Sequence, residues 1–277
     1  MSGRLQGRVA IITGASRGLG EYCAVGYARE GAKVVIAART EVESDPRLPG
    51  TIHHTAKLVE AAGGEALPVV CNVGDMDSVE AMVAKTLDHW GRIDILMTNA
   101  AVQPQGLIST IKIKSWELEF NINVHGPFRC IRAVLPAMQA QKSGNIINIS
   151  SVGAFGGSHY GATKRAIEAM TIGLARELKD DGIAVNAMRP VGGIDTPGLL
   201  FGRPASRPAG FVAAERPARP KPDSYVEAAV LLALQTPDTF TGQVYNDAQL
   251  IERLASAADK RKYREMNPEN WVNAMTA

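Results

Sequence analysis

Short apolar segments alternate with helical segments along most of this 277-residue chain, and this alternation constrains the fold more than any other feature. The strand-like segments at 9–13 and 33–38 are apolar along most of their length, and the segment 145–150 carries three isoleucines, so none of them is apolar only at every second residue. Such strands are buried on both faces, as in a parallel sheet covered by helices. The sequence therefore predicts a single-domain α/β fold: a doubly wound (Rossmann-type) parallel sheet of about seven strands with helices on both faces.

The expected elements follow from apolar periodicity and from glycine stop signals. A long helical pattern covers 115–140, where Pro127 is expected to bend or divide the helix. The domain is expected to cover 1–249, followed by a charged tail at 250–277. The other expected strands are 66–71, 93–98, 183–188 and 241–245, and the other expected helices are 18–30, 51–62, 77–90, 158–179 and 224–235.

Two segments interrupt this alternation of strands and helices. Residues 40–50 form an unusually long loop after the second strand, and residues 198–223 carry five prolines and five basic residues. Long loops in compact domains are usually functional or disordered, so the second segment is expected to be a mobile flap over the site, with a plain surface loop as the alternative. The tail is expected to wrap a neighbouring subunit, to cover the site, or to form a simple solvated helix.

Composition narrows the functional classes. The net charge of +2, with 21% charged residues, gives no clustered basic surface for nucleic acid. No run of about 18 apolar residues is present, so no membrane span is expected, and the amino terminus lacks the apolar segment of a signal peptide. The three cysteines lack disulfide or zinc spacing, and no metal site is expected. The cytoplasm is the expected location.

A glycine-rich segment, residues 13–20, lies between the first strand and the first helix. Gly14 permits a tight turn, Gly18 lets the backbone approach a pyrophosphate, and Gly20 permits close packing of helix and strand. The free N–H groups of the helix then face the phosphate. In this strand–turn–helix context the segment predicts a dinucleotide site.

The residues after the second strand favour NADP(H) over NAD(H). A carboxylate at this position usually holds the ribose 2′-hydroxyl, but here the strand ends in Ala37 and Ala38 and is followed by Arg39. A guanidinium can pair with a 2′-phosphate instead. Arg17, in the glycine-rich segment, is expected to add a second cation.

Tyr160 and Lys164 are four residues apart, so a helix places both on one face. A nearby ammonium favours the phenolate and makes the tyrosine a better acid/base group. Ser150 and Ser151 end the fifth strand, where a hydroxyl can bond a substrate carbonyl. Asn123 lies within a helical pattern, and a buried asparagine there requires hydrogen-bond partners.

Taken together and in order, these motifs resemble the short-chain dehydrogenase/reductases over roughly residues 6–247. The segment 98–101 is similar to the family's Asn-Asn-Ala-Gly signature, with Thr98 and Ala101 as departures. The long loop at 45–52 and the segment 240–242 resemble the hydroxysteroid-dehydrogenase-like group within the family. The resemblance implies catalytic roles for four residues: Asn123, Ser151, Tyr160 and Lys164.

In the roles that this resemblance implies, Tyr160 exchanges a proton with the substrate oxygen, and Lys164 holds the nicotinamide ribose and tunes Tyr160. Ser151 orients the reacting oxygen, and Asn123 holds a water that links Lys164 to solvent. Asn72 stands where relatives have an adenine-contacting aspartate. The expected cofactor-binding residues are Gly14, Ser16, Arg17, Gly18, Leu19, Gly20, Arg39, Asn72, Val73, Asn99, Ala100, Ala101, Tyr160, Lys164, Pro190, Val191, Gly192 and Thr196.

The expected activity is reversible hydride transfer between nicotinamide and a ketone, aldehyde or secondary alcohol. The segment between Ser151 and Tyr160 is shorter than in relatives, which leaves two alternatives open. In the first alternative, Ser150 takes the catalytic role of Ser151. In the second, the chain is a non-catalytic NADP(H)-binding protein. A homodimer or homotetramer is implied, with 115–140 and 158–179 as interfaces. Substrate specificity is assigned to 102–112, 152–159 and 192–223.

Overall fold

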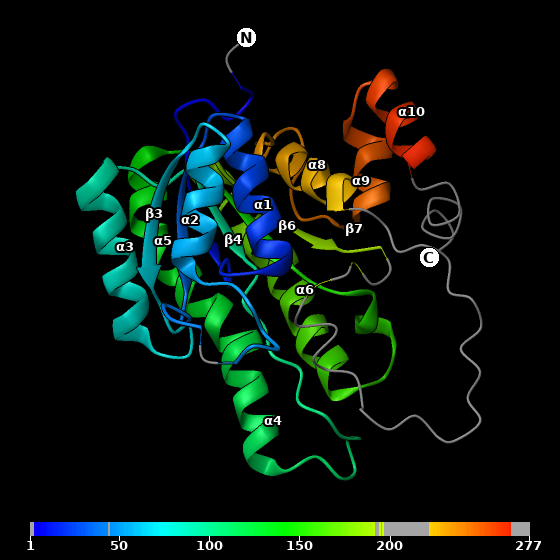
Figure 1. Ribbon diagram of the computed structural model, residues 1–277. Helices are drawn as coiled ribbons and strands as arrows, with labels where there is room; N and C mark the ends of the chain where they lie inside the picture. The colour runs from blue at the N-terminus through cyan, green and yellow to red at the C-terminus, as the bar shows by residue number, and fades with distance from the viewer. Residues whose placement is uncertain (1–2, 44, 192–193, 195, 197–221, 267–277) are drawn as a thin grey trace.

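The computed structural model describes residues 3–43, 45–191, 194, 196 and 222–266. Their strands form one seven-stranded sheet in the order β3-β2-β1-β4-β5-β6-β7, and every pair of neighbours is parallel. The predicted doubly wound fold is thus confirmed (Figure 1). The strands are β1 (Val9–Thr13), β2 (Lys33–Ala38), β3 (Glu65–Val70), β4 (Ile95–Thr98), β5 (Gly144–Ile149), β6 (Ile183–Arg189) and β7 (Val244–Asn246).

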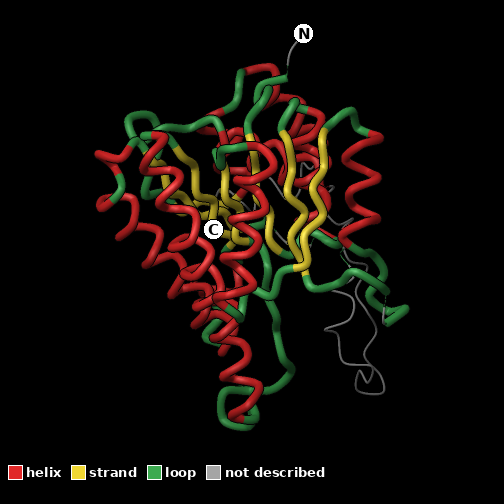
Figure 2. Tube along the Cα trace, turned by 90° about the vertical axis from the view of Figure 1, so that its left-hand side faces the viewer, coloured by secondary structure: helices red, strands yellow, loops and turns green. Residues whose placement is uncertain are grey.

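Helices cover both faces of the sheet, as Figure 2 shows from the side. One core cluster joins the sheet to α1 (Gly18–Arg29), α2 (Ile52–Ala61) and α8 (Pro222–Ala233). The second core cluster joins the opposite face to α3 (Met76–Trp90), α5 (Gly126–Gln141) and α6 (His159–Glu177). The central strands β1, β4 and β5 are buried throughout, which explains their apolar sequences.

The long helical pattern at 115–140 is divided just before Pro127. Helix α4 (Ile113–Phe120) runs into a π-helical turn, η1 (Asn121–His125), before α5 begins at Gly126. Pro127 has no N–H to donate within this continuous helical run, and the π-helical turn adjoins it on the amino-terminal side. A π-helical turn is frequently a functional feature, and here it contains Asn123.

The carboxyl-terminal elements differ from the sequence prediction. The last strand begins at Val244 rather than at 241, because Gly242 turns the backbone at a φ of +72°. Helix α9 (Asp247–Leu254) spans residue 249, and Leu250 within it is fully buried. Helix α10 (Ala257–Met266) follows it. Of the expected flap, only residues 222–223 lie within the described chain, and they start α8.

The order of the strands reverses at β1, since β2 lies on one side of it and β4 on the other. The connection after β1 leads to β2 on one side of the sheet, and the connection after β4 leads to β5 on the other side. In folds of this kind a crevice opens beyond the carboxyl ends of two such strands. The predicted site residues follow the carboxyl ends of β1 to β6, so the fold gathers them along this one edge of the sheet.

Candidate active site

The glycine-rich turn after β1 has little room for side chains. Gly14 and Gly18 have φ angles of +67° and +64°, which favour glycine. A Cβ on Gly14 would lie 2.8 Å from the Cα of Ala100, and one on Gly20 would lie 2.6 Å from Nδ2 of Asn99. These contacts are too short for any side chain. Of the other predicted residues nearby, Ser16 is buried, Leu19 half-buried and Ala101 exposed.

Asn99 and Thr13 fasten this turn to the end of β4. Nδ2 of Asn99 donates to the carbonyl oxygens of Thr13 and Gly14 at 2.9 and 3.2 Å. The buried Thr13 hydroxyl accepts from the backbone N–H groups of Asn99 and Ala100. Asn99 therefore holds the shape of the glycine-rich turn. Sequence reasoning did not single out Thr13, although it precedes the first glycine.

Arg17 stands at the N-cap of α1 and makes no side-chain cap. Its guanidinium donates to the carbonyl oxygens of Pro49 and Gly50 at 3.0 and 2.8 Å, which draws the long loop after β2 over the glycine-rich turn. Burial lowers the pKa of Arg17, and the charge of Arg39 also lowers it. The two arginines are therefore electrostatic neighbours, and Arg39 is the exposed member.

Asn72 and Val73 follow β3 at the same edge of the sheet. Oδ1 of the exposed Asn72 accepts from the N–H of Gly74 at 3.1 Å, which closes a local turn. Val73 is buried, and its carbonyl oxygen accepts from Arg129 on α5. Asn121 of the π-helical turn donates to the carbonyl oxygen of Gly74, so this loop is tied to the region of Asn123.

The two serines after β5 have different surroundings. The buried Ser150 donates its hydroxyl proton to Oε1 of Glu168 at 2.6 Å. Oγ of Ser151 accepts from the N–H of Gly153 at 3.0 Å. It lies on the side of Tyr160, because a Cβ on Gly153 would be 3.3 Å from this Oγ and 3.6 Å from the Tyr160 ring. The Ser150 proton is therefore committed within the protein, and of the two serines it is Ser151 that meets the tyrosine.

Tyr160 and Lys164 lie in the first two turns of α6. Nζ of the buried Lys164 donates to the carbonyl oxygen of Ile149 at 2.8 Å and lies 5.4 Å from the centre of the Tyr160 ring. Burial lowers the pKa of Lys164 to about 8. Burial, with the charge of Glu119, raises the pKa of Tyr160 to about 12, and the nearby Ser151 side chain opposes this rise. Serine, tyrosine and lysine therefore converge at the end of β5 despite the short segment between Ser151 and Tyr160.

Asn123 is fully buried in the π-helical turn. Its Oδ1 accepts from the N–H of Val102, and its Nδ2 donates to the Val102 carbonyl oxygen, both at 2.8 Å. Nδ2 also donates to the hydroxyl of Thr163 on α6 at 3.2 Å. The contacts of Asn123 thus join the segment after β4 to α6.

The segment after β6 is only partly described, and Gly192 lies outside the described residues. The N–H of Val191, next to Pro190, donates to Oδ1 of the buried Asp247 at 2.6 Å. Thr196 lies against the glycine-rich turn: a Cβ on Gly18 would be 3.2 Å from the Cβ of Thr196. Of this segment, Thr196 is therefore a described residue that reaches the glycine-rich turn.

Sequence reasoning missed a buried pair beside Tyr160. Neither His159 nor Glu119 was among the predicted site residues. Nδ1 of His159 lies 2.6 Å from Oε2 of Glu119, and both side chains are buried. The available signal was spacing, because Glu119 precedes the buried Asn123 by four residues and so lies on the same helix face.

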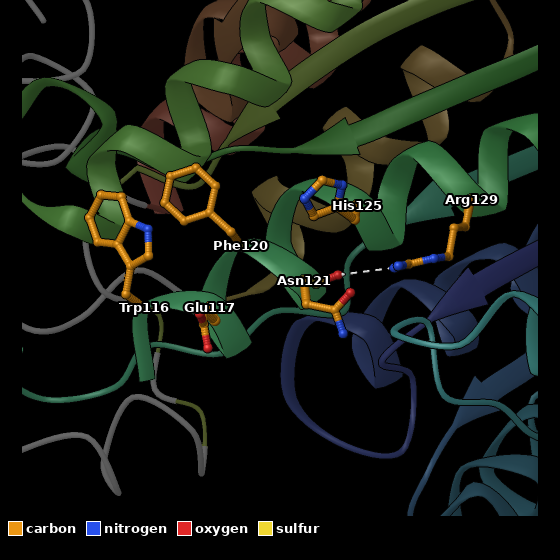
Figure 3. Close-up of a pocket in the computed structure, with 6 residues that line it drawn as sticks. All are labelled: Trp116, Glu117, Phe120, Asn121, His125 and Arg129. Atoms are coloured by element: carbon orange, nitrogen blue, oxygen red, sulfur yellow. Dashed lines mark hydrogen bonds between the residues drawn. The ribbon is translucent and has the colours of Figure 1, made fainter. Parts of the chain in front are cut away.

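An open pocket of about 500 Å³ lies elsewhere, on α4, η1 and α5. Figure 3 shows its side chains, with Arg129 donating to the carbonyl oxygen of Asn121. The predicted catalytic residues do not line it, so it is separate from the serine–tyrosine–lysine cluster. Its lining residues are Trp116, Glu117, Phe120, Asn121, His125 and Arg129.

Within the described part of the chain, no cluster of three or more histidine, cysteine or acidic side chains is arranged for a metal ion. No helix among the same residues has the length and apolar character to cross a membrane. Cys23, Cys71 and Cys130 are buried free thiols.

Comparison with known proteins agrees with this geometry. The sequence profile of the family described as short chain dehydrogenase matches residues 8–200. This chain belongs to the short-chain dehydrogenase/reductase family of oxidoreductases. The resemblance seen in the sequence is confirmed.

Individual relatives have different named activities. Hydroxysteroid dehydrogenase-like protein 2 of Xenopus laevis is 35% identical over 259 residues, which is 91% of this chain and 59% of that protein. A 3-oxoacyl-[acyl-carrier-protein] reductase of Synechocystis is 37% identical over 191 residues, 67% of this chain and 74% of that protein. The chain thus spans little more than half of the first relative's length.

Among solved structures, a metagenomic short-chain oxidoreductase in complex with NADP has a TM-score of 0.69 and 30% identity. The match covers 87% of this chain and 96% of that one. Fold and sequence therefore agree on the family, and this relative carries an NADP.

Proposed function

We propose that this chain is an NADP(H)-dependent oxidoreductase of the carbonyl reductase or alcohol dehydrogenase type, which interconverts a ketone or aldehyde and the corresponding alcohol. The observation that carries the proposal is the convergence of Ser151, Tyr160 and Lys164 at the end of β5, at the same sheet edge as the glycine-rich turn. Each of the three contributes a polar group to one location, as proton transfer to a substrate oxygen requires.

The residues of the glycine-rich turn fit a dinucleotide. A Cβ at Gly14 or Gly20 would meet protein atoms at under 3 Å, so the backbone is left bare at this turn. The first N–H groups of α1 receive no side-chain cap from Arg17, which leaves them available to a pyrophosphate. When bound, the nicotinamide supplies or accepts the hydride.

Tyr160 donates a proton to the substrate oxygen during reduction and removes one during oxidation. Oγ of Ser151 accepts a hydrogen bond from the backbone N–H of Gly153, which leaves its own hydroxyl proton free to donate. That proton can be directed to the substrate oxygen and stabilise the charge that develops there. The Lys164 ammonium lies near the tyrosine ring and favours the phenolate. Asn123 positions these groups by joining Val102 to α6.

Preference for the 2′-phosphorylated cofactor is supported by charge at the end of β2. The strand ends without a carboxylate, and the exposed Arg39 follows it. Arg17 lies close enough for the two positive charges to interact, so an anion near them is favoured. The relative with a bound NADP agrees with this proposal.

Assembly and location are part of the same proposal. Leu118, Phe128 and Ile172 are exposed apolar side chains on α4, α5 and α6, the helices expected to join subunits. A homodimer or homotetramer in the cytoplasm is the expected state.

The deciding experiment is a panel of ketones, aldehydes and hydroxysteroids, followed by the absorbance of NADPH. Turnover of at least one substrate, lost in Tyr160→Phe, supports the proposal. Tight NADPH binding without turnover of any of them favours a non-catalytic NADP(H)-binding protein instead.

A further inference from the structure

The buried contact between Glu119 and His159 connects α4 to the first residue of α6. The Glu119 side chain is 0% exposed and that of His159 is 5% exposed, and Oε2 lies 2.6 Å from Nδ1. His159 immediately precedes Tyr160. The pair thus joins the element that leads to Asn123 to the turn that carries the tyrosine.

Hydrogen-bond chemistry fixes how many protons this contact holds. Nε2 of His159 lies 3.0 Å from the carbonyl oxygen of Gly106, which can only accept, so Nε2 carries a proton. The contact between Nδ1 and Oε2 then requires a further proton, placed on either atom. In both arrangements the pair is neutral overall, and its length is that of a charge-assisted hydrogen bond.

The pair also holds the segment after β4 in place. The imidazole bonds the backbone at Gly106, within the segment 102–112 that the sequence assigned to substrate specificity. Oε1 of Glu119 is one of three buried side-chain polar atoms without a hydrogen-bond partner among the described residues. A half-satisfied buried carboxylate is costly, and such a group calls for an explanation other than packing.

When the shared proton is on Nδ1, Glu119 is the negative end of the pair, and its carboxylate acts on both Tyr160 and Lys164. It raises the pKa of Tyr160, second to burial, and it opposes the lowering of the Lys164 pKa by burial. Glu168 also faces Lys164, but its carboxylate is bound by Ser150, Arg165 and Arg189. Glu119 is therefore the facing carboxylate that has no arginine partner among the described residues.

We propose that Glu119 and His159 form a proton-sharing positioning pair, which holds the first turn of α6 against α4 and the Gly106 segment and sets the electrostatic environment of Tyr160 and Lys164. The proposal rests on the proposed function, because it assigns these residues to the same acid/base site. They do not touch the substrate and act through Tyr160 and Lys164.

The kinetic test uses Glu119→Gln, which keeps the size of the side chain and can donate to Nδ1. The exposed Glu117→Gln on the same helix is the matched control. In the oxidation of a secondary alcohol, the rising limb of kcat/KM against pH moves down in Glu119→Gln, because the negative end of the neutral pair, at the Glu119 carboxylate, no longer faces the phenolate. The control keeps the wild-type limb. A lower rate with an unmoved limb overturns the proposal.

A second readout needs no turnover. The Lys164 side chain is titrated by NMR without cofactor, and its signal is assigned from the Lys164→Arg variant. The wild-type midpoint is expected at about 8. Glu119→Gln lowers it, because the negative end of the pair no longer faces Lys164, and Glu117→Gln leaves it in place. A lowered midpoint in a protein that turns over no substrate supports the pair while rejecting the proposed function. If the protein turns over substrate but Glu119→Gln moves neither the Lys164 midpoint nor the limb of the kcat/KM profile, the positioning pair is rejected and the proposed function stands.

The wild-type protein provides a test that does not depend on a folded variant. Nitrogen NMR of the histidine side chains distinguishes protonated from bare ring nitrogens. A protonated Nε2 in His159, with Nδ1 in a strong hydrogen bond, supports the shared proton. A bare Nε2 overturns the proposal.

Discussion

Ser150 donates its hydroxyl proton to Glu168 at 2.6 Å, in a buried cluster that also contains Arg189. This bond separates the two adjacent serines by function. Ser150 stabilises the junction of β5, β6 and α6, whereas Ser151 faces Tyr160. Adjacent residues of an extended chain point to opposite sides, which is why only one serine of the pair reaches the tyrosine.

Replacement of the two serines by alanine should therefore have opposite consequences. Ser150→Ala should lower the free energy of unfolding by about 1–2 kcal/mol, because Glu168 loses a buried hydrogen bond. It should change kcat/KM only several-fold. Ser151→Ala should lower kcat/KM by about 100-fold or more, with little change in stability. Urea denaturation and steady-state kinetics measure the two effects, and a larger catalytic loss in Ser150→Ala would reverse the assignment.

Tyr160→Phe removes only the hydroxyl that exchanges a proton with the substrate oxygen. We expect kcat to fall by about 1000-fold or more, within the range of general acid–base catalysis. NADPH affinity, followed by its fluorescence, should change little because the ring remains. Retention of wild-type turnover would rule out the acid/base assignment.

Arg39→Ala should weaken NADPH binding by about 10- to 100-fold and leave NADH binding nearly unchanged, because only the 2′-phosphate contact is lost. Arg47→Ala is a matched control, since Arg47 is an exposed arginine of the same loop that pairs with Asp45. Titration of all three proteins with both cofactors gives the comparison. Equal losses for the two cofactors in Arg39→Ala would speak against phosphate recognition.

Asp247 predicts a pH dependence of stability. Burial raises its pKa from 3.8 to about 6. As the pH rises through this window, the unfolded state loses the proton before the folded state does, so stability falls and then levels off above about pH 6. The non-titrating Asp247→Asn should gain stability relative to wild type over this window, by up to about 3 kcal/mol.

Urea denaturation of both proteins between about pH 4 and 7 tests this prediction. The side-chain amide introduced by Asp247→Asn would still offer an oxygen to the N–H of Val191, which makes the substitution mild. A stability difference that stays constant with pH would show that Asp247 does not titrate in this range.

The fold was predictable because its signal is local. Strands such as β1 and β2, which are apolar in all but one residue and are separated by helical periods, specify a parallel sheet covered on both faces. The glycine-rich turn and the pair Tyr160 and Lys164 were predictable for the same reason, since spacing along one turn or one helix face determines their placement. The start of β7 was missed because a left-handed glycine, Gly242, turns the chain just before it.

The sequence by itself thus determined the fold family and the placement of the proposed acid/base residues on one helix face, which depend on periodicity and short spacing. Only the tertiary structure decided which serine meets Tyr160, that Arg17 holds the loop at Gly50, and that Glu119 pairs with His159. These contacts join residues from different elements, and Glu119 and His159 are 40 positions apart. No local pattern encodes them, because they arise where packing brings buried polar groups together and each requires a partner.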